Sequence, residues 1–319
     1  MKKIIYILIL LVVSCSKEQT TEPTTPSGTV EARIVTDPTS RAVVSGTSFA
    51  KSSNVGVFLY KEDGTTHTTS SNENIKAYYT TISNVPQWVY YFSYSSSVYQ
   101  SSITLDKDDG AAVCYAYYPY STTGTDPEAI SITMSNQYDF MYAKNNEITM
   151  PDSDSDSDTD VKIGLSFDHA LSCINFNFQL ENEGQNYVRL EGIQFNADKD
   201  IMTVGSFNLK TQTLTTTTTE TKTFSALSSS SYVTITDDLT YGFLVPPTGE
   251  GVAYTVYLTL NGIKMETPID IPATTYEKGT SYTVNVTLGN YAKFTGISID
   301  ETWTQSSTDN EDTYLEHTI

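Results

Sequence analysis

The chain has 319 residues, 12% of them aromatic, and this length is sufficient for two domains of ordinary size. Its formal net charge is −20 at pH 7, and a field of this sign repels nucleic acid and anionic lipid headgroups, so we exclude nucleic acid as a partner. The 23 tyrosines and the charged fraction of only 18% are typical of an extracellular β-protein.

The N-terminus has the pattern of an export signal. Two lysines precede an apolar run, residues 4–13, which is too short for the ~20 residues of a membrane-spanning helix. The run ends in Val-Val-Ser-Cys, which resembles a bacterial lipobox, where a signal peptidase cuts before a lipid-modified cysteine. We expect residues 1–14 to be a lipoprotein signal peptide and Cys15 to be the lipidation site. The protein is then a surface-exposed lipoprotein of the outer membrane. The alternative is a plain signal peptide with an incidental cysteine.

Composition also predicts the domain organisation. Residues 15–27 are rich in Thr, Pro and Ser and predict a flexible tether. Beyond it, short β-prone runs separated by Gly, Asn, Asp and Pro predict two antiparallel β-sandwich domains, at 28–160 and 161–319. The division falls at the run "PDSDSDSDTD" (151–160), because alternating aspartates cannot be buried. This run lacks the Gly and Glu of an EF-hand loop, so we expect no specific metal site there, and weak calcium binding at 152–160 stays open.

Local turn chemistry predicts one hairpin. Asn261-Gly262 lies between alternating runs, and a type I′ turn needs positive φ at both central residues. A two-residue loop places Leu260 opposite Ile263. A separate low-complexity run, "TLTTTTTETKTF" (213–224), predicts an exposed strand and hairpin because threonine has high β-propensity.

The sequence contains no phosphate-binding loop, zinc-ligand spacing or nucleophile elbow, so we expect neither a cofactor nor catalytic residues. Cys114 and Cys173 lie in apolar strand-like runs and are either buried free thiols or a single disulfide. The tyrosines at 78–79 and the aromatic run 90–92 are either strand packing or a platform for stacking a sugar.

A strand is predicted soon after the tether. Val30, Ala32 and Ile34 alternate with more polar positions, the pattern of a half-buried strand over 28–37. Pro38 ends it, and Arg41 follows in a polar turn. Because basic residues are scarce, Arg41 is a candidate site for a trypsin-like protease.

The order of several short motifs resembles the Bacteroidales fimbrillins, the type V pilins and related fimbrillin-like lipoproteins. The resemblance covers about residues 1–304. Its motifs are the lipobox and, in order, "SRAVVSGTSF", "NVGVFLY", "YAYYPY", "QYDFMYAK", "FDHALSCINFNF" and "TGISIDETWT". Each motif is short, and the ordered set is much more specific than any one of them.

The resemblance implies a fold of two transthyretin-like Greek-key sandwiches and a mode of assembly. An arginine-specific surface protease removes the lipidated N-terminal segment with its first strand, and a strand from another fimbrial subunit fills the vacated groove. By position, Val30, Ala32 and Ile34 are the groove-plugging residues, and Arg41 is the cut site with Arg33 as the alternative.

The same resemblance assigns the donor strand to the C-terminal segment, where Leu315 and Ile319 are the candidate groove-filling residues. The rest of that segment is polar, so it is a weak donor. A weak donor leaves open an alternative, a lipid-anchored or tip adhesin of the same fold that binds a glycan or host protein and does not polymerise.

Overall fold

The structure is a computed structural model that describes residues 29–36, 53–67, 73–92, 98–150, 161–181, 188–220, 223–226, 230, 232–235, 239–265, 268–288 and 292–300. Within these ranges the regular structure is β, apart from two short 3-10 helices, η1 (Lys107–Asp109) and η2 (Met134–Asn136). None of the described helices is long and apolar enough to span a membrane. The predicted all-β class is confirmed.

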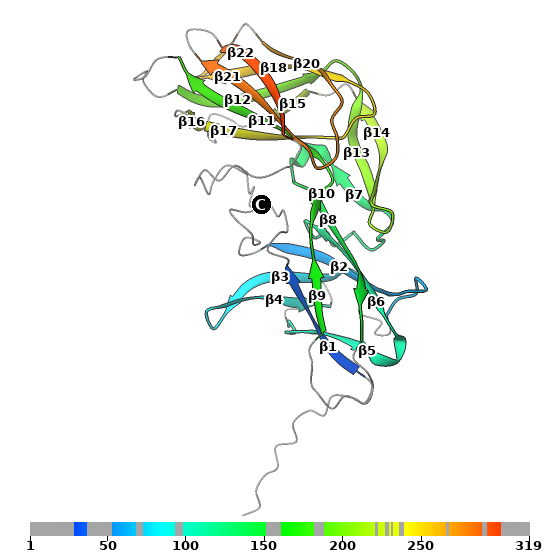
Figure 1. Ribbon diagram of the computed structural model, residues 1–319. Coiled ribbons are helices and arrows are strands. Elements are labelled where there is room, and N and C mark those ends of the chain that lie inside the picture. Colours follow the sequence, from blue (N-terminus) through cyan, green and yellow to red (C-terminus); the bar gives the residue numbers. More distant parts are fainter. Residues whose placement is uncertain are drawn as a thin grey trace, which may run out of the picture.

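The N-terminal part is a sandwich of two sheets (Figure 1). A three-stranded sheet in the order β5-β1-β9 packs on a six-stranded sheet in the order β10-β8-β6-β2-β3-β4. Their bounds are β1 (Thr29–Thr36), β2 (Asn54–Lys61), β3 (Ile75–Ile82), β4 (Val85–Tyr91), β5 (Ile103–Asp106), β6 (Ala112–Tyr118), β8 (Met141–Ile148), β9 (Val161–Leu165) and β10 (Asp168–His169).

Strands β2 and β6 are apolar on both faces because each face meets a different core. Along β6, Cys114 and Ala116 pack in the core beneath β1, whereas Tyr115 and Tyr117 point to the opposite face and a second core. Successive side chains of a strand point to opposite faces, so a strand buried on both sides has no polar positions to alternate with. This explains the continuous apolar run at 112–118.

The C-terminal part is a second sandwich. One sheet has the order β17-β11-β21-β22, and the other has the order β15-β12-β18-β19 with β16 and β20 pairing with β12 and β18. Stacked aromatic rings fill the space between them; the rings of Phe195 and Phe243 are 3.9 Å apart between centroids. The bounds are β11 (Ser172–Leu180), β12 (Val188–Ala197), β15 (Thr223–Ala226), β16 (Val233–Ile235), β17 (Leu239–Val245), β18 (Val252–Leu260), β19 (Ile263–Lys264), β20 (Ile269–Thr274), β21 (Ser281–Leu288) and β22 (Ala292–Asp300).

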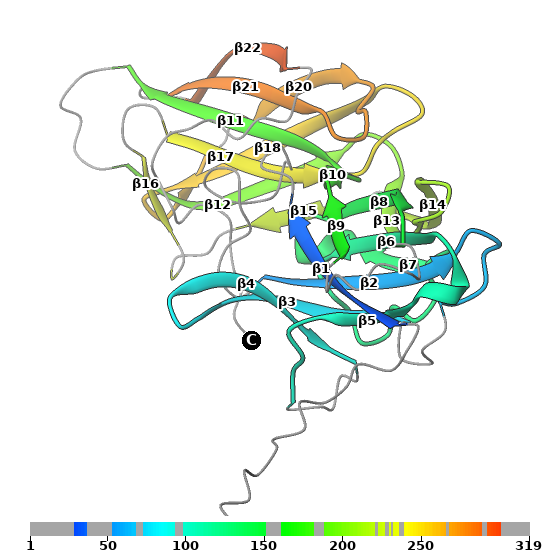
Figure 2. The same cartoon turned by 60° about the horizontal axis from the view of Figure 1, so that its bottom comes forward.

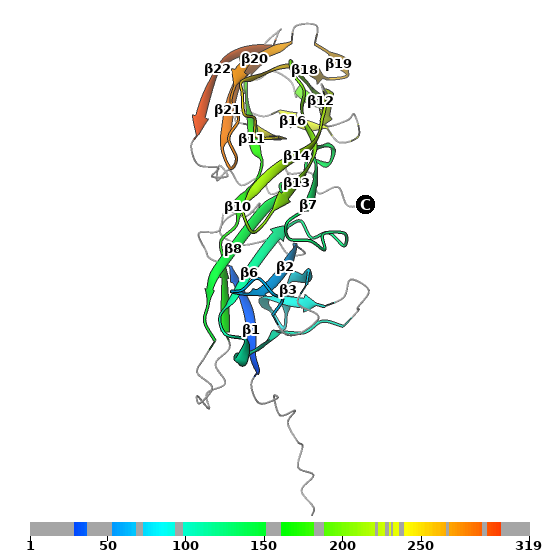
Figure 3. The same cartoon turned by 90° about the vertical axis from the view of Figure 1, so that its right-hand side faces the viewer.

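A fifth sheet joins the two sandwiches. It has the order β14-β13-β7, with bounds β7 (Ile130–Thr133), β13 (Ile201–Asn208) and β14 (Thr213–Glu220), and it lies between the two groups of strands in Figure 3. The ring of Phe207 in β13 lies 4.5 Å from that of Tyr142 in β8, between centroids. A single core therefore runs from the outer face of the six-stranded sheet into the C-terminal sandwich.

The strand pairing of the N-terminal sandwich continues past the domain boundary predicted at residue 160. Strand β9 pairs with β1, and Ile163 and Leu165 are fully buried in the N-terminal core. Two ladders are parallel, β1 with β9 and β11 with β21, so the predicted sandwiches are not purely antiparallel. Parallel pairing joins segments far apart in the chain, which local patterns do not reveal.

The hairpin predicted at Asn261-Gly262 is confirmed. Both residues have positive φ, 49° and 78°, and Leu260 pairs with Ile263. The side chain of Ile263 is nevertheless 72% exposed, and β19 lies at the edge of its sheet. The threonine run forms β14, whose residues are exposed apart from the half-buried Leu214.

Candidate assembly site: the first strand and its slot

Strand β1 has one buried face and one exposed face. Val30, Ala32 and Ile34 are 7%, 0% and 5% exposed and belong to the N-terminal core, while Glu31 and Arg33 point outward. Full burial of a valine or isoleucine side chain stabilises a fold by about 1.5–3 kcal/mol each. The inward face therefore contributes substantially to the stability of this sandwich.

Two different strands flank β1, as Figure 2 shows. Its first half, Thr29 to Ala32, pairs antiparallel with β5, and its second half, Ala32 to Thr36, pairs in parallel with β9. Among the described strands, both neighbours pair with β1 alone. Removal of β1 would leave β5 and β9 as two edges with unpaired backbone groups, which is the arrangement that recruits another strand.

The walls of the slot are apolar. Ile103 and Leu105 on β5 and Ile163 and Leu165 on β9 are all 0% exposed. These four side chains line the same core as the inward face of β1. The space that β1 occupies therefore selects an apolar, alternating strand.

Tyr90 completes the hydrogen bonding of β1 where β5 no longer reaches. The backbone N–H of Ile34 donates to the Tyr90 hydroxyl oxygen at 2.7 Å, beyond the last residue of β1 that β5 pairs. The Tyr90 side chain is fully buried, and burial raises the pKa of its hydroxyl, which therefore stays protonated across the physiological range. A buried N–H without a partner is costly, so Tyr90 stabilises the second half of β1 in the slot.

Arg33 lies in the middle of this paired strand. It is the Cα partner of Lys162 in β9, and its guanidinium contacts Glu31 at 3.5 Å on the outer face. A protease binds its substrate as an extended segment with free backbone groups, whereas Arg33 is already paired with Lys162 of β9. This geometry disfavours cleavage at Arg33 while the sandwich is intact.

The remaining predicted site residues lie outside the described ranges. These are Cys15, Arg41, Leu315 and Ile319, and the aspartate run 151–160 is also outside. Among the described residues, no group of three or more His, Cys, Asp or Glu side chains is placed to hold a metal ion.

The structure also places the two cysteines and the aromatic residues of the predicted sugar platform. Cys114 and Cys173 are free buried thiols in different cores. Of the aromatic residues proposed as a sugar platform, Tyr79, Tyr90 and Phe92 pack toward the N-terminal core. Tyr78 lies on the opposite face of β3, so the predicted platform is split between two faces.

Sequence reasoning identified the inward face of β1 but missed its surroundings. Nothing near Tyr90 distinguishes it from the tyrosine that follows, since the run 88–92 is aromatic or apolar throughout. The role of β9 was hidden by the aspartate run before it. Only the sheet pairing brings residues 32–36 and 161–165 together.

Comparisons with known proteins find one matching family model and solved structures of similar fold. A family model described as fimbrillin-like matches residues 40–308, so the match begins after β1. A solved structure from Bacteroides uniformis, of a protein provisionally assigned to cell adhesion, is similar with 17% identity and a TM-score of 0.60 over 88% of this chain and 100% of that one. A Bacteroides ovatus protein with the same provisional assignment has 18% identity and a TM-score of 0.58 over 87% of this chain and 98% of that one. No curated protein matches the chain.

Proposed function

Because this chain belongs to the fimbrillin-like family, we propose that it is a structural subunit of a surface fimbrium, assembled by strand exchange after proteolytic removal of β1. The family consists of structural proteins, so the chain is not an enzyme. Its partners are other fimbrial subunits, identical or different.

The observation that carries the proposal is the position of β1. A strand that is central in its sheet, buried on one face and contributed by the N-terminal end of the chain occupies a slot that another strand can fill. Backbone pairing then supplies affinity, and the alternating side chains set the register. Because such a head-to-tail contact does not close on itself, repeated exchange produces a filament.

Export and processing complete the proposal. Lipidation at Cys15 anchors the precursor in the outer membrane, and an arginine-specific surface protease cuts after Arg41. The pairing of Arg33 with Lys162 of β9 supports Arg41 as the site. A cut after Arg41 releases the whole of β1, whereas a cut after Arg33 would leave Ile34 behind.

The donor is a C-terminal segment of the next subunit. Leu315 and Ile319 are four residues apart, as are Val30 and Ile34, so they can replace these two side chains in the slot. In that register His317 takes the place of Ala32, which is fully buried.

The misfit of His317 favours the alternative function. A larger, polar side chain at a position that holds only a methyl group weakens binding of this donor. The chain would then be a lipid-anchored or tip adhesin that donates its strand poorly, does not polymerise, and binds a host protein or glycan.

Limited trypsin treatment of the purified precursor separates these functions. On unboiled, non-reducing gels, the pilin function gives a ladder of SDS-resistant oligomers after cleavage at Arg41. Monomer alone after complete cleavage supports the adhesin. Intact mass of the surface-extracted protein distinguishes a retained acylated Cys15 from a chain that begins at Ala42.

A further inference from the structure

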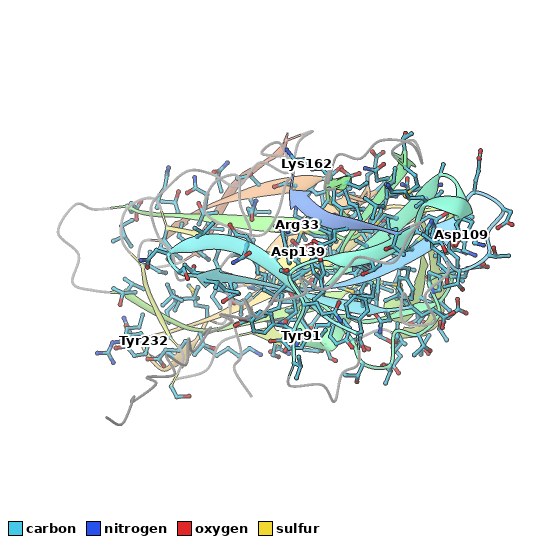
Figure 4. All side chains as sticks on the ribbon, turned by 90° about the horizontal axis from the view of Figure 1, so that it is seen from below. Arg33, Tyr91, Asp109, Asp139, Lys162 and Tyr232 are labelled. Carbon is cyan, nitrogen blue, oxygen red and sulfur yellow. The ribbon has the colours of Figure 1, made fainter. Side chains whose placement is uncertain are left out.

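The outer side of the β1–β9 ladder carries two cations next to each other. Arg33 and Lys162 are Cα partners in the parallel pairing, and both are exposed. Figure 4 labels both residues in a view from below. The whole chain has 18 basic against 38 acidic residues, so two basic side chains at facing positions are not expected from composition.

This arrangement opposes the pairing of β1 with β9. Like charges at facing positions of neighbouring strands are destabilising. Arg33 has a compensating contact with Glu31, but at 3.5 Å between side chains that are 44% and 48% exposed this ion pair is weak. Among the described residues, Lys162 has no ion-pair partner.

We propose that Lys162 makes the slot selective for charge. Repulsion between Lys162 and Arg33 weakens the binding of β1 in the slot. Lys162 also favours an incoming strand with an acidic residue at the position of Arg33. This inference rests on the proposed strand exchange. The buried face of the slot sets which side chains fit, and Lys162 adds a preference on the face that remains in water.

A second copy of this chain offers a strand without the repelling cation. In the register that aligns Leu315 with Val30 and Ile319 with Ile34, Thr318 takes the position of Arg33. Residues 305–319 contain four acidic residues, Asp309, Glu311, Asp312 and Glu316, and no lysine or arginine. Replacement of β1 by such a strand exchanges a repulsive contact at Lys162 for a neutral one. The contact on the outer face therefore favours the donor strand over β1. A high concentration of donor strands favours the same replacement.

A double-mutant cycle in the uncleaved chain tests the charge contact without any polymerisation. Lys162→Glu places opposite charges side by side, and hydrogen-exchange protection of β1 is expected to rise about 2- to 10-fold, with a smaller rise at high salt. In an Arg33→Gln background the same substitution should change nothing. Lys264→Glu, exposed in β19 far from the slot, makes the same change in net charge and should leave β1 unaffected.

Three outcomes overturn the charge contact: unchanged protection in Lys162→Glu, an equal rise in the Arg33→Gln background, or an equal rise in Lys264→Glu. The cycle needs no strand to leave, so its result is independent of the proposed function.

Peptide exchange tests the selectivity itself. The chain is cut after Arg41 and incubated with synthetic peptides that copy residues 28–37, with either arginine or glutamate at position 33. The native slot should take up the glutamate peptide at least twofold faster, and the Lys162→Glu slot should prefer arginine. If each slot takes up the arginine and glutamate peptides at equal rates, the selectivity is refuted. If the cycle holds and neither peptide enters, strand exchange is refuted while the repulsion between Arg33 and Lys162 stands.

Discussion

Replacement of Tyr90 by phenylalanine should loosen β1 without altering the shape of the core. The substitution removes only the hydroxyl that accepts the N–H of Ile34 at 2.7 Å. That N–H is buried and lies past the end of the β5 pairing, so no neighbouring strand replaces the lost partner. Leaving a buried donor unpaired costs about 1–3 kcal/mol, which corresponds to a ~5- to 150-fold increase in the population of molecules with β1 detached.

Hydrogen exchange followed by mass spectrometry measures this directly, because the peptide that contains β1 can be resolved from the rest. We expect the slow amides of residues 29–36 in Tyr90→Phe to lose protection by this factor. Tyr254→Phe is the matched control. Its hydroxyl is buried in the C-terminal sandwich and has no hydrogen-bond partner among the described residues, so its removal should leave β1 unaffected and should not destabilise the fold. Equal protection of β1 in Tyr90→Phe and the native chain would refute the role given to this hydrogen bond.

Three further predictions concern processing, the thiols and pH. Arg41→Gln should abolish the trypsin-induced oligomer ladder on unboiled gels, whereas Arg33→Gln should leave it intact; a ladder that depends on Arg33 would contradict the assignment. Burial raises the pKa of both the Cys114 and Cys173 thiols, so neither should react with a maleimide at pH 8 in the folded chain without Cys15, and both should react in urea without reductant. If urea exposed no thiol until reductant was added, the two would be paired. Burial lowers the pKa of His67, so the unfolded chain binds this proton first as the pH falls below about 6.5, and folded stability is lost there. The drop in urea midpoint from pH 7.5 to 5.5 should therefore be smaller in His67→Asn, and an unchanged drop would argue against this origin.

Features set by neighbouring residues were predictable from the sequence. The Asn261-Gly262 turn follows from the φ angles that these two residue types tolerate, and its register follows from the loop length. The alternation at Val30, Ala32 and Ile34 marked a strand with one apolar face, and the structure buries that face. In each case the signal spans fewer than about ten residues.

Features set by distant pairing were not predictable. The aspartate run at 151–160 marks a polar segment by composition, but it does not reveal that residues 161–165 return to pair with β1. Tyr90 bonds a residue 56 positions away in the chain, and no spacing rule links the two. The same holds for Ile263, because its position on an edge strand is set by the order of strands in the sheet.

The departure of β1 can be tested by locking it in place. Glu31 and Thr104 are Cα partners on β1 and β5, and facing residues of antiparallel strands are about 4.5–5.5 Å apart, within the range that a disulfide spans. The native thiols Cys114 and Cys173 are buried and should not interfere. In a chain that carries Glu31→Cys and Thr104→Cys, oligomers after cleavage at Arg41 should be absent while the disulfide is intact and should form once it is reduced. Oligomers that form equally well with the lock closed would contradict assembly through the slot of β1.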